Sequence, residues 1–226
     1  MKNKRFTKIA VLAAMALLCS GAIFTSAWAQ CPCPAVDTSD AQHIHATPPW
    51  NGHTMLVDTM FGSCEAYVCY ECRVTSAGND DYKTNKVCID SECWARYCAT
   101  HGLTVGTPAS DSILISQANY DLFPMLFDTT YGNPCGFSCP QCPGDGTINW
   151  DEFTATCWDS YYDGGGKYEL VNCGNFGWCL NAYTICCNNG KPTRTFLRSV
   201  NVTWTCSEPD CELVNCPPPQ NYPATH

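Results

Sequence analysis

The stretch LNAYTICCNNGKPTRTFLRSVNVTWTC, residues 180–206, carries the clearest structural signal in this chain. Two runs rich in β-branched and aromatic residues flank NNGKP, and an Asn-Gly step is favoured in tight turns between antiparallel strands. In the second run Phe196 and Val200 alternate with Ser199 and Asn201, which indicates a strand with one buried face and one solvated face. The stretch therefore predicts a β-hairpin.

Three more segments of the N-terminal half predict strands. Residues 53–61, HTMLVDTMF, are largely apolar. Residues 64–75, CEAYVCYECRVT, and residues 82–90, YKTNKVCID, are rich in β-branched and aromatic side chains, and the turn-forming SAGNDD lies between them. We therefore expect a second antiparallel hairpin in this half of the chain.

Helices are expected at three places. SECWARYCATHG, residues 91–102, starts with a capping Ser91 and ends at Gly102, which suits a left-handed C-terminal position. DSILISQANYDLF, residues 111–123, has apolar residues four apart and precedes Pro124, which limits its length. A third helix is expected after Asn149. With the hairpins, these segments predict a disulfide-rich α+β fold of antiparallel β-hairpins with two or three short helices.

The N-terminal segment predicts export. MKNKRFTK carries four positive charges, an apolar stretch follows, and Ala27 and Ala29 form an A-x-A cleavage pattern. Residues 1–29 are therefore expected to be a signal peptide of bacterial type. The mature chain is expected to be secreted or held at the cell surface, without membrane insertion after cleavage.

The charge balance excludes several partners. Without its first 29 residues the chain of 226 keeps 197, and its basic residues fall from 12 to 8 against 21 acidic ones, so the formal charge drops from −9 to −13. Nucleic acid and anionic lipid both demand clustered Lys and Arg. We therefore expect no nucleic-acid partner, whereas a solvated acidic surface and acidic groups that meet divalent cations both stay open.

Composition divides the chain beyond the signal peptide into four parts. Residues 30–62 form an extended N-terminal segment, residues 63–131 and 132–216 form two disulfide-rich subdomains, and residues 217–226 form a Pro-rich tail. Glycine and proline crowd residues 132–146, which mark the expected junction between the subdomains.

Cysteine dominates the composition. Removing Cys19 with the signal peptide leaves 19 of the 20 cysteines, about one residue in ten. That density is typical of a disulfide scaffold in an oxidising compartment. CYEC at Cys69 and CPQC at Cys139 also have zinc-knuckle spacing, but export favours disulfides. Cys186 and Cys187 point to opposite faces of a strand, so they should bond to two different partners.

The odd number of cysteines leaves one sulfur unpaired if all the others bond within the chain. Cys31 and Cys33 are separated only by Pro32, so a bond between them would be strained. These two and Cys216 lie near proline-rich ends and are the candidates for intermolecular disulfides to a second copy or to envelope proteins. The alternative is that both ends are bonded internally and one buried thiol remains.

GDGTINWDEF, residues 144–153, is similar to the second half of an EF-hand calcium loop. The candidate calcium ligands are Asp145, Thr147, Asn149 and Glu152. Gln141 and Pro143, however, stand where the first half of that loop supplies oxygen ligands. The alternative is a turn at GDG followed by a helix that Asn149 caps and Glu152 closes as a capping box.

Histidines offer a second candidate metal site. HIH provides His43 and His45, and with His53 they would hold copper or zinc if one face of a hairpin gathered them. The surrounding segment is rich in proline and supplies no clear scaffold. We therefore expect no bound cofactor, and calcium is the one alternative that the sequence leaves open.

Aromatic residues adjoin many cysteines, as in CWDSYYD and GWCLNAY. Packing over disulfides is the simpler interpretation. The other interpretation is an exposed platform for sugar or for a partner chain, formed by Trp158, Tyr161, Tyr162 and Tyr168 beside a glycine run.

The sequence contains no GxSxG elbow, HExxH helix or phosphate-binding glycine loop. The leading hypothesis is a secreted, non-enzymatic structural or surface protein, such as a covalently cross-linked filament or envelope subunit. The alternatives are an extracellular glycan- or calcium-binding module and a secreted hydrolase whose carboxylate pair no motif marks.

Overall fold

The computed structural model describes residues 31–35, 50–75, 78–143, 146–174, 177–202 and 205–222. The expected signal peptide and the candidate ligands His43, His45 and Asp145 lie outside the described residues. The chain forms two compact units, residues 1–32 and residues 33–226, and every element below belongs to the second. Within the described ranges no helix combines the length and the apolar character that a membrane crossing requires.

The second unit is mostly a β-sheet with two α-helices in its described part. The strands are β1 (Asn51–Met60), β2 (Cys64–Val74), β3 (Asp80–Asp90), β4 (Ile148–Ala155), β5 (Cys157–Tyr162), β6 (Lys167–Asn172), β7 (Trp178–Asn188), β8 (Lys191–Val202) and β9 (Glu212–Leu213). The helices are α2 (Ser91–Thr100), α3 (Pro108–Phe127) and the short 3₁₀ turn η2 (Thr129–Tyr131). All nine strands belong to one sheet, which is mostly antiparallel.

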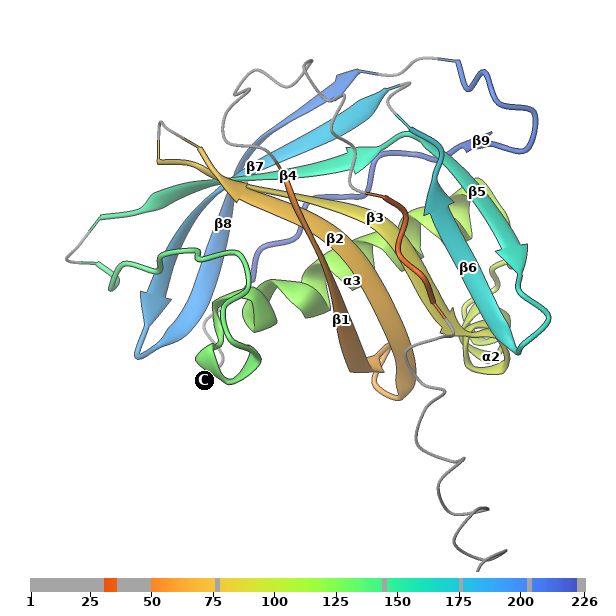
Figure 1. Ribbon diagram of the computed structural model, residues 1–226, viewed down its shortest axis with the longest axis horizontal. Helices are drawn as coiled ribbons and strands as arrows, with labels where there is room; N and C mark the ends of the chain where they lie inside the picture. The colour runs from red at the N-terminus through yellow and green to blue at the C-terminus, as the bar shows by residue number, and fades with distance from the viewer. Residues whose placement is uncertain are drawn as a thin grey trace, which may run out of the picture. The chain divides into compact units, whose positions relative to one another are not determined.

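β3 is the central strand of this sheet. One of its edges pairs with β2, which in turn pairs with β1. Its other edge carries two strands in succession: residues 80–84 pair in parallel with β4, and residues 86–90 pair antiparallel with β6. The sheet therefore divides into one arm of β4, β7 and β8 and another of β6, β5 and β9, which diverge from β3 in Figure 1.

Both predicted hairpins are confirmed. β2 and β3 pair from Val74 opposite Asp80 outward, and β7 and β8 pair from Asn188 opposite Lys191. Asn189 and Gly190 form the turn of the second hairpin with φ of 50° and 77°. This left-handed pair is what a tight hairpin turn requires, and Asn and Gly adopt it most easily.

The expected alternation along β8 is wrong, because a β-bulge interrupts it. The register shifts between Phe196, which pairs with Tyr183, and Arg198, which pairs with Ala182. A bulge adds one residue and so reverses the face of every later side chain. Phe196 accordingly faces the core with Tyr183, whereas Val200 lies on the other face and is 39% exposed.

The two N-terminal helices are confirmed with changed ends. Asp90 rather than Ser91 caps α2, because its carboxylate accepts the amide of Cys93. α3 starts earlier than predicted, at a capping box between Thr107 and Ser110. It also continues through Pro124, so the expectation that this proline limits the helix is wrong.

The third predicted helix is wrong. Residues 148–155 and 157–162 form β4 and β5 instead. Trp150 and Thr154 on one side of β4 and Phe153 on the other are all buried. When both faces of a strand are covered, the period-two alternation disappears, and the remaining apolar spacing imitates a helix.

The main core lies between α3 and one face of the sheet. Leu114, Ala118 and Leu122 of α3 are fully buried, and large aromatic side chains such as Trp150 and Trp94 pack in the same cluster. Figure 1 shows α3 running behind β2 and β3. The opposite face of the sheet, which we call the outer face, carries a smaller cluster of Trp50, Phe153 and Leu180.

Eight disulfides are defined within the described part of the second unit. They are Cys33–Cys69, Cys64–Cys93, Cys72–Cys135, Cys139–Cys187, Cys142–Cys186, Cys157–Cys206, Cys173–Cys211 and Cys179–Cys216. Cys31 and Cys88 are disulfide-bonded as well. The prediction that Cys186 and Cys187 bond to different partners is confirmed.

The two expected subdomains share this one sheet. β3, from residues 63–131, pairs directly with β4 and β6, from residues 132–216. Cys72–Cys135 crosses the expected boundary, and residues 33–226 form one compact unit. The structure joins the two segments rather than separating them.

Candidate functional site

A row of buried ion pairs crosses the outer face of the sheet. Lys83 Nζ lies 2.9 Å from Glu71 Oε2, and Arg73 Nε donates to Asp81 Oδ2 at 2.8 Å. Glu71 and Arg73 are two residues apart on β2, as are Asp81 and Lys83 on β3, so strand alternation places all four on the same face. The side chains of both pairs are at most 8% exposed.

The same row continues toward β5. Lys86 Nζ lies 2.6 Å from Glu169 Oε2, which also accepts the hydroxyl of Tyr161 at 2.7 Å. A buried charge is tolerated only when it is paired and hydrogen-bonded. The three pairs therefore order the side chains of this face into one arrangement.

Trp50 packs over the first part of the row. Its ring lies 4.1 Å from the guanidinium carbon of Arg73 and 4.9 Å from Lys83 Nζ, so both cations face its π-system. The edge-to-face contact of Trp50 with Phe153, at 6.0 Å, holds the ring in place. Trp50 is 6% exposed, so it shields these charges from water.

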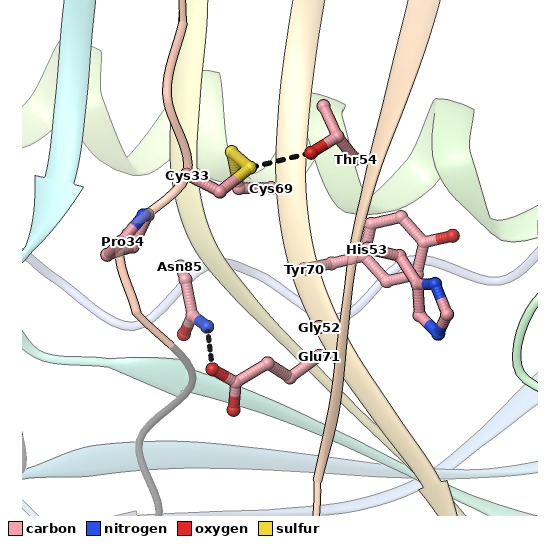
Figure 2. A pocket seen from close by; sticks show the side chains of 9 residues that line it. All are labelled: Cys33, Pro34, Gly52, His53, Thr54, Cys69, Tyr70, Glu71 and Asn85. Carbon is pink, nitrogen blue, oxygen red and sulfur yellow. Dashed lines mark hydrogen bonds between the residues drawn. A yellow bond between two sulfur atoms is a disulfide. The ribbon is translucent and has the colours of Figure 1, made fainter.

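A cavity of about 210 Å³ lies beside this row, between the segment at Cys33 and Pro34 and strands β1 to β3. Figure 2 shows its lining, with the Cys33–Cys69 disulfide next to Thr54 and with Asn85 reaching Glu71. Asn85 Nδ2 donates to Glu71 Oε1 at 2.6 Å, and Cys33 Sγ lies 2.7 Å from Thr54 Oγ1. The disulfide fixes the N-terminal segment over the sheet and so forms one wall of the cavity.

The polar groups that line this cavity mainly form hydrogen bonds and ion pairs with neighbouring side chains. Glu71 is held by both Lys83 and Asn85, so its charge is already compensated. The rings of His53 and Tyr70 point away from Glu71 and Asn85 in Figure 2, as alternation along β1 and β2 requires. The cavity can accept a small polar molecule, but its lining does not bring a base to a nucleophile.

Two carboxyl groups on the core side are buried without a cationic partner in any ion pair of the described residues. Burial and the neighbouring charge of Asp81 raise the pKa of Asp80 to about 7, and Asp80 is 2% exposed. Burial raises the pKa of Asp111 to about 6, although Tyr168 donates to its carboxylate at 2.6 Å. Both groups therefore titrate near neutral pH.

A wider groove of about 390 Å³ lies at the β5 end of the sheet. Its lining includes the carboxylates of Asp159, Glu208 and Asp210, the amide of Asn172 and the ring of Tyr161. The hydrogen bond to Glu169, burial, and the surrounding negative charges raise the pKa of Tyr161 to about 12. The Cys173–Cys211 disulfide joins the two segments that form the walls.

The calcium site expected at Thr147, Asn149 and Glu152 is not formed by these residues. Asn149 and Glu152 are three apart on β4, so their side chains point to opposite faces of the sheet. Glu152 is bonded to Arg194 Nη1 at 2.8 Å in the core, and Asn149 donates to Asn79. The predicted cap and capping box fail for the same reason, since no helix begins at Asn149.

Of the three candidate copper or zinc ligands, only His53 lies within the described residues. Its nearest ligand-type neighbours are Cys72 and Cys135, with all three ligand atoms within 4.8 Å of one another. Those two sulfurs are bonded to each other, so neither is a thiolate. Burial lowers the pKa of His53 and so favours its neutral ring.

The candidate intermolecular cysteines are bonded within the chain. Cys33 bonds to Cys69 and Cys216 bonds to Cys179, which corrects the expectation that these two reach a second molecule. Cys31 is disulfide-bonded too. Among the described residues the one free cysteine is Cys98, which is buried, and burial raises the pKa of its thiol to about 11. This arrangement agrees with the alternative in which both ends of the chain are bonded internally and one buried thiol remains.

The expected aromatic platform is split by its strands. Trp158 and Tyr168 are buried in the core, each 1% exposed. Tyr161 and Tyr162 are exposed, but as neighbours on β5 they point to opposite faces of the sheet. Only Tyr161 lines the acidic groove.

Sequence reasoning missed the charged outer face and the groove. The signal for the first was the spacing of Glu71 with Arg73 and of Asp81 with Lys83, which puts charges at every second strand residue. The groove combines β5 with residues 208–211, and no local pattern relates those segments.

No protein-family model, curated protein or solved structure matches the chain. The many disulfides fit an extracellular, disulfide-stabilised protein.

Proposed function

We propose that this chain works outside the cell as a non-enzymatic structural or surface protein. The observation that carries the proposal is the distribution of its disulfides. Cys33–Cys69 fixes the start of the second unit to the sheet, and Cys179–Cys216 fixes its C-terminal segment. A unit of this size can bury enough surface to fold without bridges, so bridges at both ends favour a protein that must resist proteases and unfolding.

The outer face supports the same proposal. Its charged side chains are buried in pairs that hold one another and hold Trp50, so they add rigidity to the sheet. A structural role needs this persistence of shape. β8, and β5, which β9 covers only in part, also carry exposed apolar side chains suited to contact with other proteins.

Cell fractionation tests this role. An antibody against the chain should detect it on intact producing cells or in material sheared from their surface, and the sheared protein should sediment with large particles. The protein should resist added protease until a thiol reductant is supplied. Recovery of all the protein as freely diffusing monomer in the medium would contradict a structural or surface role.

A second candidate function is ligand binding in the acidic groove. Tyr161 offers a ring on which a sugar can stack, and Asp159, Asn172 and Asp210 offer acceptors for hydroxyl groups or for calcium. Glycan-array binding and calorimetry with calcium test this function. Binding should be lost in Tyr161→Ala for a glycan and in Asp210→Asn for calcium, and it should persist in the distant surface variant Asp58→Asn.

A further inference from the structure

Two outer edges of the sheet, at β8 and at β5, carry opposite charge, whereas β1 at the third edge has one acidic residue and no Lys or Arg. β8, at one end of the strand order, contains the exposed Lys191 and Arg198 and no acidic residue; its third basic residue, Arg194, is buried against Glu152. At the other end, residues 157–163 and 205–213 contain five acidic residues and no basic one. Those five are Asp159, Asp163, Glu208, Asp210 and Glu212. We call these two ends the basic edge and the acidic edge.

Backbone groups at both edges lie open. The C-terminal segment covers only the first half of β8, where Arg194 exchanges two backbone hydrogen bonds with Tyr222 and Phe196 donates to Asn221. No described segment pairs with residues 197–202 on that side. β9 likewise covers only Cys157 and Trp158 of β5, and no described segment pairs with the outer edge of residues 159–162.

Apolar exposure is concentrated at the same two places. Eight large apolar or aromatic side chains are exposed in the described part of the chain, and five of them lie at these edges. Leu197 and Val200 belong to the basic edge, and Tyr161, Tyr162 and Leu213 belong to the acidic edge. Exposed apolar side chains beside unpaired strand edges mark sites where another chain can dock.

We propose that the basic edge of one copy docks on the acidic edge of the next, so that copies associate head to tail. Pairing residues 197–202 with residues 159–162 would place Leu197 and Val200 near the exposed tyrosines and Arg198 among the carboxylates. This inference rests on the proposed structural role and names the partner as a second copy of this chain.

Charge decides between this arrangement and symmetric alternatives. Two basic edges would bring Lys191 and Arg198 against the same residues of the partner, and two acidic edges would bring ten carboxylates together. Like charges placed opposite each other destabilise strand pairs and interfaces. The positive charge of Arg198 also disfavours pairing of this edge with a strand that lacks opposite charge. A head-to-tail contact satisfies both edges, and because it is heterologous it builds assemblies of more than two copies, as open chains or closed rings.

Charge-reversal variants test the contact on the disulfide-bonded protein beginning at Gln30. In sedimentation velocity the assemblies of the wild type should grow beyond the dimer as its concentration rises, and added salt should weaken the association. Lys191→Glu with Arg198→Glu should weaken it at least about tenfold, and so should Asp159→Lys with Asp210→Lys. Arg96→Glu, on the exposed side of α2, is the matched control and should associate like the wild type. Circular dichroism checks that each variant is folded.

Each double variant alone separates head-to-tail association from symmetric pairing. Both variants should be monomeric, because each lacks one half of the contact, whereas symmetric pairing through one edge would persist in the variant whose other edge is changed. The mixture should form alternating chains, because reversed edges meet reversed edges and unchanged edges meet unchanged edges. A monomeric wild type, a plateau at the dimer, or a mixture that stays monomeric would overturn the inference. Failure of the inference does not remove the structural role, since the sheared surface fraction tests that role independently of how copies meet.

Discussion

Asp80 shows how burial sets the protonation state of a single residue. It lies at the start of β3 and is 2% exposed, and its Oδ2 accepts no hydrogen bond from the described residues. Burial favours the neutral acid, so the folded protein binds this proton more tightly than the unfolded chain does. The same reasoning applies to Asp111, with a smaller shift.

Stability should therefore rise as the pH falls from 8 to 5. The folded pKa values of Asp80 and Asp111, about 7 and about 6, lie above the unfolded value, so protonation stabilises the fold until the unfolded chain also binds the proton. The gain from Asp80 should be about 2–3 kcal/mol over this range. Urea denaturation at each pH measures it. Asp80→Asn should remove most of the slope, and Asp58→Asn, an exposed carboxyl, should keep it; a wild type that loses stability on acidification in this range would contradict the assignment.

Glu152 and Arg194 form the buried ion pair of the core. Arg194 also donates from Nε to the backbone of Gln220, and its guanidinium lies 4.8 Å from the ring centre of Tyr183. Removing one partner leaves the other charge buried and uncompensated, so Glu152→Gln should lower the free energy of unfolding by about 3–5 kcal/mol. Urea denaturation should show the same loss in calcium and in EDTA. A wild-type melting temperature that rises with calcium, in a manner that Glu152→Gln abolishes, would instead restore the calcium assignment.

Elements were predictable where local chemistry decides them. The sequence predicts three such features that the structure contains: the Asn189–Gly190 turn, the cap region of α2 and the apolar stripe of α3. The sequence did not predict β4 as a strand. Trp150 packs on its core side and Phe153 on its outer side, and a strand that is buried on both faces lacks the alternation of apolar and polar residues. No sequence pattern marks the β-bulge in β8, so the sequence could not show on which face of the sheet the side chains after the bulge lie.

The C-terminal segment is an element whose position depends on one bridge. It crosses from β9 to β8 with few backbone bonds, and Cys179–Cys216 fixes its middle. Cys179→Ala with Cys216→Ala should lower the free energy of unfolding by about 2–4 kcal/mol, because the unfolded chain regains the freedom of that loop.

Limited proteolysis distinguishes local release from general unfolding in that variant. Chymotrypsin should cut at Leu213 in the double variant while the sheet stays intact, because the freed segment becomes accessible. Cys98→Ala, which removes no bridge, should keep the wild-type cleavage pattern. Identical resistance of the double variant and the wild type would show that hydrogen bonds of Asn221 and Tyr222 hold the segment without the disulfide.

At the scale of the whole molecule, topology came from contacts that no local pattern records. The division of the sheet at β3 joins residues 80–84 to a strand about 70 positions later, in parallel. The sequence predicts the elements of the fold, namely hairpins, helices and disulfides, but not which strand edges pair with each other. The acidic groove follows from that topology and no local pattern predicts it, whereas the outer charged face is indicated in the sequence by the spacing of its charges along β2 and β3.

The fate of the odd cysteine is a property of the whole molecule and gives the last prediction. Cys98 is the free cysteine of the described residues; it is 1% exposed, and burial raises its pKa to about 11. A thiol is reactive only as an accessible thiolate, so the folded chain beginning at Gln30 should not react with maleimide. After denaturation without reductant, mass spectrometry should find one adduct per chain, located at Cys98. Cys98→Ala should give none under the same conditions. Two or more adducts, or a dimer that only reductant separates on a gel, would mean that one of the bonded sulfurs pairs elsewhere in the native protein.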